Sequence, residues 1–217
     1  MGRDGEDCVD ACVWNPDMLD PLMRRLIDSP LDRVGRRLAG AGVSANAVTL
    51  AGFAVGLLAI PCLAAQWYGA ALAAILVNRL ADGLDGAVAR HTALSDYGGY
   101  LDIVCDFIFY AGVAFGFALA RPENAVPAAF LILSFVGTGT SFLAFAILAA
   151  KRGLASEARG RKSLYYLGGL TEGTETIAIF VVFCLFPSVF PTLAYVFAAL
   201  CWMTTAARVV TARRRFG

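Results

Sequence analysis

The segment of this chain that decides its fold carries four aspartates in helical register. It runs Asp82-Gly-Leu-Asp85-Gly86-Ala-Val-Ala89-Arg90 and, after a short turn, Gly98-Gly-Tyr-Leu-Asp102-Ile-Val-Cys-Asp106. The i,i+3 spacing of the first pair and the i,i+4 spacing of the second place each pair on one face of a helix. Carboxylates within apolar helices are costly, and ion or proton binding is the usual reason for them. The segment therefore predicts a functional site.

The four carboxylates favour a divalent metal site. A short turn makes the two helices antiparallel, so the two pairs of aspartates are expected to face one another. Only Arg79 and Arg90 lie nearby in sequence, and a divalent cation would balance the remaining negative charge. Oxygen ligands favour magnesium or manganese over zinc or copper. Four carboxylates can hold two ions about 4 Å apart, an arrangement that clamps both oxygens of a phosphoryl displacement.

The two arginines have different expected roles. Arg90 ends the first helix and is placed to pair with a phosphate oxygen. Arg79 is interpreted as a structural counter-charge in preference to a phosphate ligand. The sole histidine, His91, is expected in a solvated turn.

Composition indicates an integral membrane protein. Hydrophobic residues make up 59% of the 217 residues and charged residues 16%, which is typical of a bundle of membrane spans. The fold class predicted is therefore all-α, with six spans in a domain over residues 41–212. The spans are expected at 47–66, 69–90, 97–120, 126–150, 172–186 and 191–210. The run Gly137-Thr-Gly-Thr-Ser141 in the fourth span predicts close helix packing.

The N-terminal part is expected to lie outside the membrane core. Residues 1–16 are acidic, unlike a signal peptide, and are interpreted as a disordered tail. Residues 17–40 alternate apolar and basic side chains at helical spacing, with Ser29 and Pro30 predicted to restart the helix. Such a helix lies in the headgroup plane, although a helix packed on the protein itself remains the alternative.

Basic residues predict the orientation. Of the 18 lysines and arginines, only Arg121 falls in a segment expected on the outer side. The rest, including the basic tail at 213–217, fall on or near the other side. By the positive-inside rule, both termini and the aspartates are expected at the cytoplasmic face of the inner (plasma) membrane.

In this membrane setting, the motif resembles the signature of a known family. Asp82-x2-Asp85-Gly86-x2-Ala89-Arg90-x7-Gly98-x3-Asp102-x3-Asp106 is similar to the complete signature of the CDP-alcohol phosphotransferases (CDP-alcohol phosphatidyltransferases). Asn46 and Thr49 resemble the family's Pro-Asn-x-x-Thr segment, with Ala45 in place of proline. The likeness covers about residues 40 to 210, and the chain resembles a bacterial branch.

The resemblance implies a reaction and roles for the residues. It implies transfer of a substituted phosphate from a CDP-alcohol, CDP-diacylglycerol being the expected donor, to an acceptor alcohol, with release of CMP. Asp82, Asp85, Asp102 and Asp106 would hold Mg²⁺ or Mn²⁺, in two sites, and Asp106 would also act as general base. Asn46, Thr49, Gly86 and Arg90 would contact the CDP moiety. The resemblance also implies a homodimer, and no nucleic-acid partner is expected.

Two other classes of protein carry intramembrane acids. Magnesium-dependent prenyltransferases use aspartate-rich motifs, but on well-separated spans. Cation-coupled transporters place acids near the bilayer midplane, whereas these aspartates lie about two turns from the cytoplasmic helix ends.

Two further acids open the fifth span on the same side. Glu172 and Glu175 are candidates for an acceptor pocket that binds a cationic or polyhydroxyl acceptor. The alternative is that they stabilise the N-terminus of the helix through its dipole, with Thr171 as N-cap.

Overall fold

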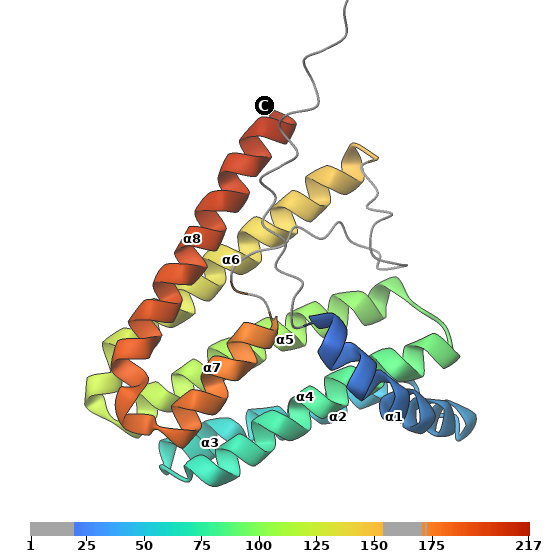
Figure 1. Ribbon diagram of the computed structural model, residues 1–217, viewed down its shortest axis with the longest axis horizontal. Coiled ribbons are helices and arrows are strands. Elements are labelled where there is room, and N and C mark those ends of the chain that lie inside the picture. Colours follow the sequence, from blue (N-terminus) through green and yellow to red (C-terminus); the bar gives the residue numbers. More distant parts are fainter. Residues whose placement is uncertain (1–19, 154–170, 172) are drawn as a thin grey trace, which may run out of the picture.

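All regular structure in the described residues is helical. The computed structural model describes residues 20–153, 171 and 173–217, with side chains from residue 30 onward. The predicted tail at 1–16 and Glu172 lie outside these residues. The helices, drawn in Figure 1, are α1 (Asp20–Gly40), α2 (Ala45–Leu57), α3 (Ala59–Ala64), α4 (Tyr68–His91), α5 (Asp96–Ala120), η2 (Pro122–Asn124), α6 (Ala125–Lys151), α7 (Gly173–Leu185), η4 (Pro187–Val189) and α8 (Phe190–Phe216). The prediction of an all-α fold is confirmed for this part of the chain.

Four helical segments within the described ranges are long and apolar enough to cross a membrane. They are Ala45–Ala64, Asp96–Ala120, Pro122–Lys151 and Pro187–Phe216. Helix α4 has 24 residues but carries the first aspartate pair and two arginines, and α7 has only 13 residues. Length and composition therefore support four of the six predicted spans.

The first predicted span is interrupted. Helix α2 ends at Leu57 and α3 begins at Ala59, whereas an unbroken segment was expected over 47–66. Pro61 has no backbone N–H and cannot donate to the Leu57 carbonyl. The Leu58 N–H instead donates to the Val55 carbonyl at 3.0 Å, which tightens the chain at the break.

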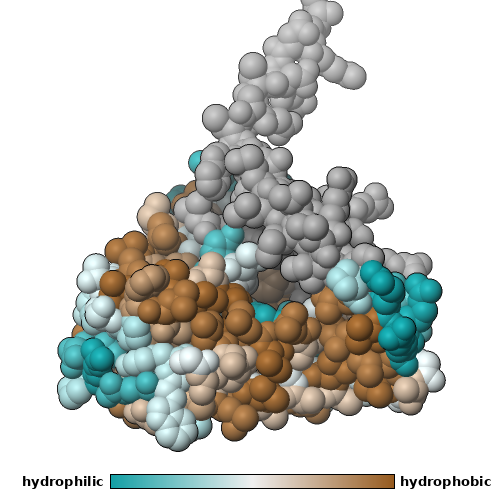
Figure 2. All heavy atoms as spheres, turned by 60° about the horizontal axis from the view of Figure 1, so that its bottom comes forward, coloured by the Kyte–Doolittle hydropathy of each residue, from teal (hydrophilic) through white to brown (hydrophobic). Residues whose placement is uncertain are grey.

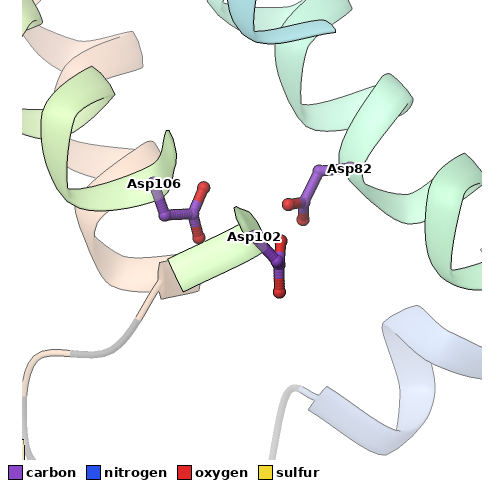
Figure 3. A group of neighbouring side chains, drawn as sticks. All are labelled: Asp82, Asp102 and Asp106. Carbon is purple, nitrogen blue, oxygen red and sulfur yellow. The ribbon is translucent and has the colours of Figure 1, made fainter. Parts of the chain in front are cut away.

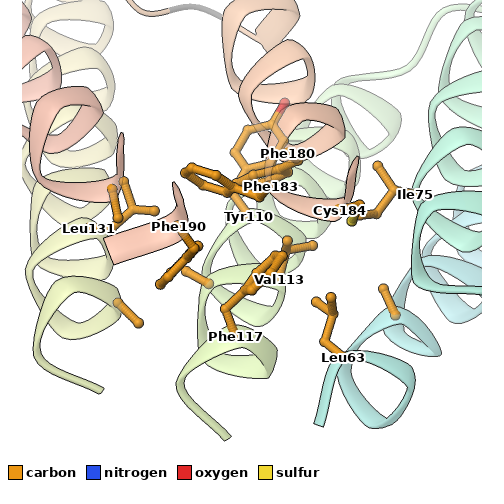
Figure 4. Packing of buried hydrophobic residues seen from close by; sticks show 14 of the residues in the cluster. Leu63, Ile75, Tyr110, Val113, Phe117, Leu131, Phe180, Phe183, Cys184 and Phe190 are labelled. Carbon is orange, nitrogen blue, oxygen red and sulfur yellow. The ribbon is translucent and has the colours of Figure 1, made fainter. Parts of the chain in front are cut away.

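An aromatic core joins the C-terminal helices to α5 (Figure 4). The ring of Phe117 on α5 stacks on Phe190 of α8, with the ring centroids 4.5 Å apart. Phe183 of α7 meets Phe190 edge-on at 4.8 Å. All three rings are fully buried, and such pairs add stability beyond the area they bury. This core fixes α5, and hence two of the aspartates, relative to α7 and α8.

Small residues let α6 approach both of its neighbours, as predicted. A Cβ built at Gly137 would lie 3.1 Å from the Trp202 ring of α8, and one at Gly139 would lie 2.7 Å from the Phe107 ring of α5. In Figure 1, α6 and α8 run side by side. The prediction of close packing at this run is confirmed.

The outer surface is that of a membrane protein. Figure 2 shows a face covered mostly by hydrophobic residues, with hydrophilic residues gathered toward its ends. Large apolar side chains are more than half exposed on several helices, among them Leu80, Leu119, Ile147 and Met203. Exposed apolar surface of this extent indicates contact with lipid.

Helix α1 packs on the helix that carries the first aspartate pair. A Cβ built at Gly35 would lie 2.7 Å from the Ala87 Cβ and 2.9 Å from the Ala87 carbonyl carbon of α4. The predicted restart at Ser29 is wrong, because α1 continues through Pro30. Packing of α1 on α4 keeps the helix continuous at Pro30, although the local sequence favours the start of a new helix there.

Replacing Gly35 by Ala is expected to destabilise the protein by about 1–3 kcal/mol, because the added methyl group overpacks the contact with α4. Gly40→Ala is the matched control in the same helix, since a Cβ there meets nothing within 4 Å. The control should be neutral or slightly stabilising, because alanine favours helix. Thermal unfolding of both variants in detergent measures the difference, and equal melting temperatures would contradict the packing described.

Candidate active site

Three of the predicted aspartates converge at the meeting of α4 and α5. Asp82 projects from α4, and Asp102 and Asp106 project from α5 (Figure 3). One carboxylate oxygen from each lies within 4.8 Å of the others. The antiparallel arrangement predicted from the short turn therefore brings the two helices' carboxylates to one place.

The fourth aspartate lies in the same pocket but contacts a different helix. The hydroxyl of Thr49 on α2 lies 2.5 Å from Asp85 Oδ2 and 3.1 Å from the Ala45 carbonyl, and it donates to one of them at a time. Asp85 is only 8% exposed. Thr49 therefore positions the Asp85 carboxylate and joins α2 to the site.

The pocket itself is small, and most of the residues that line it are polar or charged. It is lined by Thr49, Phe53, Asn78, Arg79, Asp82, Asp85, Asp102, Cys105 and Asp106. Its four carboxylates offer oxygen ligands, which suit a hard divalent cation. The three converging carboxylates are close enough together to share such an ion, so the residues present fit a metal site.

Arg79 lies inside this pocket. The sequence had indicated only that it is close to Asp82 along the chain. Its Nη2 donates to Asp106 Oδ1 at 2.5 Å, and its Nη1 lies 3.6 Å from Asp82 Oδ2. The Tyr110 hydroxyl donates to the other oxygen of Asp106 at 3.1 Å. The interpretation of Arg79 as a counter-charge agrees with these ion pairs.

Asn46, a predicted nucleotide contact, lies where α2 meets the start of α5. A Cβ built at Gly98 would come within 3.1 Å of Asn46 Oδ1 and of Ser95 Oγ. The Ser95 hydroxyl accepts the Gly98 N–H at 3.0 Å and caps α5. The signature glycine at 98 therefore has a structural reason, since any side chain there would crowd Asn46.

Gly86 and Arg90 lie on the last turns of α4, beside α1. Among the described residues, a Cβ at Gly86 would meet only the Arg90 guanidinium, at 4.0 Å. Arg90 Nε lies 3.9 Å from Asp32 Oδ1 of α1, and His91 Nε2 lies 2.9 Å from the same oxygen. The hydrogen bond with His91 holds the pKa of Asp32 below its ordinary value, so Asp32 is a carboxylate at neutral pH. His91 thus ends α4 and contacts α1. It is exposed, as predicted, but it belongs to the helix and not to the turn.

The start of α7 lies beside the site. A Cβ built at Gly173 would lie 3.3 Å from the Tyr110 hydroxyl. Glu175, in the first turn of α7, is exposed. The hydroxyl of Thr171 lies 3.1 Å from the Thr204 hydroxyl of α8. Glu175, one of the two acidic candidates for an acceptor pocket, therefore follows closely in the chain after Gly173, which lies beside Tyr110.

Sequence reasoning missed Asn78 and Tyr110. Asn78 precedes Asp82 by four residues, and Tyr110 follows Asp106 by four. Each therefore shares a helix face with an aspartate, a signal that extending the helical register by one turn would have found.

Comparisons with known proteins agree with this geometry. The sequence model of the family described as CDP-alcohol phosphatidyltransferase matches residues 42–213. The chain is 55% identical over 193 residues to the inner membrane protein YnjF of Escherichia coli, covering 88% of this chain and 94% of that protein. It is 31% identical over 198 residues to archaetidylinositol phosphate synthase of Pyrococcus horikoshii, covering 89% and 96%.

The fold is also that of a solved structure. The crystal structure of Mycobacterium tuberculosis phosphatidylinositol phosphate synthase (PgsA1) with CDP-DAG bound has a TM-score of 0.66 and 21% identity, and the match covers 83% of this chain and 92% of that one. The match of the family model over most of the chain shows that the chain belongs to the CDP-alcohol phosphatidyltransferase family, enzymes that transfer a substituted phosphate group from a CDP-alcohol to an acceptor alcohol.

Proposed function

We propose that this protein transfers a phosphatidyl group from CDP-diacylglycerol to a polyol and releases CMP, at the cytoplasmic face of the inner membrane. The convergence of Asp82, Asp102 and Asp106 between the two signature helices carries this proposal. Family membership favours it over the prenyltransferase and transporter alternatives. The solved structure of similar fold has CDP-DAG bound, which supports this donor.

The aspartates are proposed to hold two divalent ions, Mg²⁺ or Mn²⁺. Enzymes of this family use divalent metal ions. Asp82, Asp85, Asp102 and Asp106 supply oxygen ligands from both signature helices, and Thr49 holds one of them in place. When bound, the ions would neutralise the charge that develops on the phosphates during displacement.

Asp106 is proposed as the general base. It takes the proton from the acceptor hydroxyl as that oxygen forms a bond to the phosphorus bearing the diacylglycerol, while the bond from this phosphorus to the CMP oxygen breaks. Contacts to both carboxylate oxygens, from Arg79 and Tyr110, fix the orientation of Asp106. A base held in one orientation is positioned to take the acceptor proton during a single in-line displacement.

Asn46, Thr49, Gly86 and Arg90 are proposed to contact the CDP moiety. Among the described residues, only the Arg90 guanidinium borders the space where a side chain at position 86 would lie. Because Gly86 has no side chain, a phosphate can approach its backbone closely. The guanidinium of Arg90 is half exposed and is placed to pair with a phosphate oxygen.

The acceptor is proposed to bind beside the start of α7, where Glu175 and Glu172 would contact its hydroxyl groups. The relative from Pyrococcus horikoshii is named archaetidylinositol phosphate synthase, which supports an acceptor of the inositol type. Carboxylates at this position disfavour a phosphorylated acceptor by charge repulsion. Inositol and inositol phosphate are therefore the acceptors to compare.

The remaining topology is part of the same proposal. Six spans, including α4 and α7, would place both termini in the cytoplasm, with α1 at the interface and packed on α4. The active form is proposed to be a homodimer. Basic residues at the ends of α6 and α8, including Lys151 and Arg213, support the orientation.

The test is CMP release by the purified protein in lipid nanodiscs. CDP-diacylglycerol and a soluble CDP-alcohol are each offered with inositol, inositol phosphate and glycerol, with and without Mg²⁺ or Mn²⁺. Metal-dependent CMP release with CDP-diacylglycerol and inositol supports the proposal. Release only with inositol phosphate would overturn the acceptor proposal, and release only from a soluble CDP-alcohol would overturn the donor.

Replacing Asp32 by Asn is expected to raise the KM for CDP-diacylglycerol about threefold to fivefold with kcat little changed. Asp32 contacts both Arg90 and His91, but these pairs are partly exposed, and exposed ion pairs have small effects. Arg36→Gln is the matched control, because Arg36 pairs with Asp32 at 3.2 Å from an exposed position. Steady-state kinetics should show no change in KM for the control. A changed kcat with unchanged KM for Asp32→Asn would contradict a role in positioning Arg90.

A further inference from the structure

The guanidinium of Arg79 is a permanent cation within the aspartate site. It contacts Asp106 and lies 3.6 Å from Asp82, two of the three carboxylates that converge. An arginine stays protonated in proteins, so this positive charge is present at every pH at which the enzyme works.

A second set of contacts, independent of the aspartates, holds Arg79 in place. Its Nε and Nη2 donate to Asn78 Oδ1 at 3.1 and 3.0 Å. Asn78 is buried and donates its own Nδ2 to the Gly52 carbonyl of α2 at 3.1 Å. These bonds anchor the guanidinium to α2 and α4 without any carboxylate.

Two aromatic residues of α5, Phe109 and Tyr110, also contact the guanidinium and form, with Asn78, what we call the cradle of Arg79. The guanidinium carbon lies 5.4 Å from the centre of the Phe109 ring and 5.6 Å from that of Tyr110, within the range of cation–π attraction. The Arg79 side chain is only 17% exposed. Its position therefore does not depend on its pairing with Asp106, and it is expected to stay when a metal ion binds.

We propose that Arg79 makes the two metal sites unequal. A fixed positive charge beside Asp106 and Asp82 repels a divalent cation bound near it more than one bound farther away. The first ion binds tightly without nucleotide, and the second binds tightly only when the phosphates of the donor add their negative charge. This inference rests on the proposed two-ion site and adds an order of binding, in which the donor completes the metal centre.

The test is a Mn²⁺ titration of the protein in nanodiscs, followed by electron paramagnetic resonance, with and without CDP. The wild type is expected to bind one ion tightly and a second at least about tenfold more weakly. CDP should remove most of that difference. Two equally tight ions in the wild type without CDP would overturn the proposal, and this measurement needs no variant.

Three variants separate charge from structure. Arg79→Gln is expected to bring the two affinities to within about threefold of each other, while Arg79→Lys should keep the sites unequal. Tyr110→Phe keeps the charge and removes a hydroxyl that contacts both Arg79 and Asp106, so its sites should also stay unequal. Unequal sites in a folded Arg79→Gln protein would overturn the inference. Absence of Mn²⁺ binding in the wild type would overturn the proposed function itself.

Discussion

Asp106→Asn is expected to lower the rate of CMP release by about 100-fold to 10,000-fold, the range of a lost general base. The amide keeps the shape of the side chain and can still accept the Tyr110 hydroxyl, but it cannot take a proton from the acceptor. It also loses the ion pair with Arg79. Steady-state CMP release with saturating donor and acceptor measures the effect on kcat.

Asp96→Asn is the matched control for this substitution. Asp96 is an exposed carboxylate in the first turn of the same helix, outside the pocket. Its replacement should leave kcat within about twofold, because exposed charges away from a site have small effects. Full activity of Asp106→Asn would show that another group removes the proton.

Asp82→Ala is expected to abolish measurable transfer and to weaken Mn²⁺ binding by about 100-fold or more. Loss of an outer-shell partner of a metal ligand already lowers affinity by about tenfold to 100-fold, and Asp82 is proposed to be a ligand itself. It is also the one member of the converging group that comes from α4. Calorimetric titration with Mn²⁺ and CMP release on the same preparation measure both effects.

Glu123→Ala is the control for the loss of an acidic residue. Glu123 is exposed in η2, at the end of α5 remote in sequence from the aspartates. It should change neither Mn²⁺ affinity nor turnover. If Asp82→Ala lost activity and bound Mn²⁺ as tightly as the wild type, Asp82 would act on the substrate and not on the metal.

Helical register made much of the site predictable. The spacing of Asp102 and Asp106 fixes both on one face of α5, whatever else packs around them. Apolar length predicted the positions of the main helices closely, as for α5, expected at 97–120 and found at Asp96–Ala120. Local signals failed where packing overrode them, as at Pro30, which lies inside α1.

The contacts that position the site were not predictable in the same way. Arg79 was expected to balance charge, but its bond to Asp106, 27 residues away, depends on how α4 packs on α5. The bond between Thr49 and Asp85 spans 36 residues, and that between Asp32 and His91 spans 59. No periodicity within one helix specifies such pairs.

The sequence by itself therefore determined the helical class, the face of each helix that carries the aspartates, and the family signature. These follow from the period of the helix and from apolar length, which are properties of short segments. Only the tertiary structure decided which aspartate meets Thr49, that Arg79 lies among the carboxylates in a cradle of its own, and that α1 packs against the end of α4. These depend on the relative positions of whole helices, which are set by side-chain packing between segments far apart in the chain.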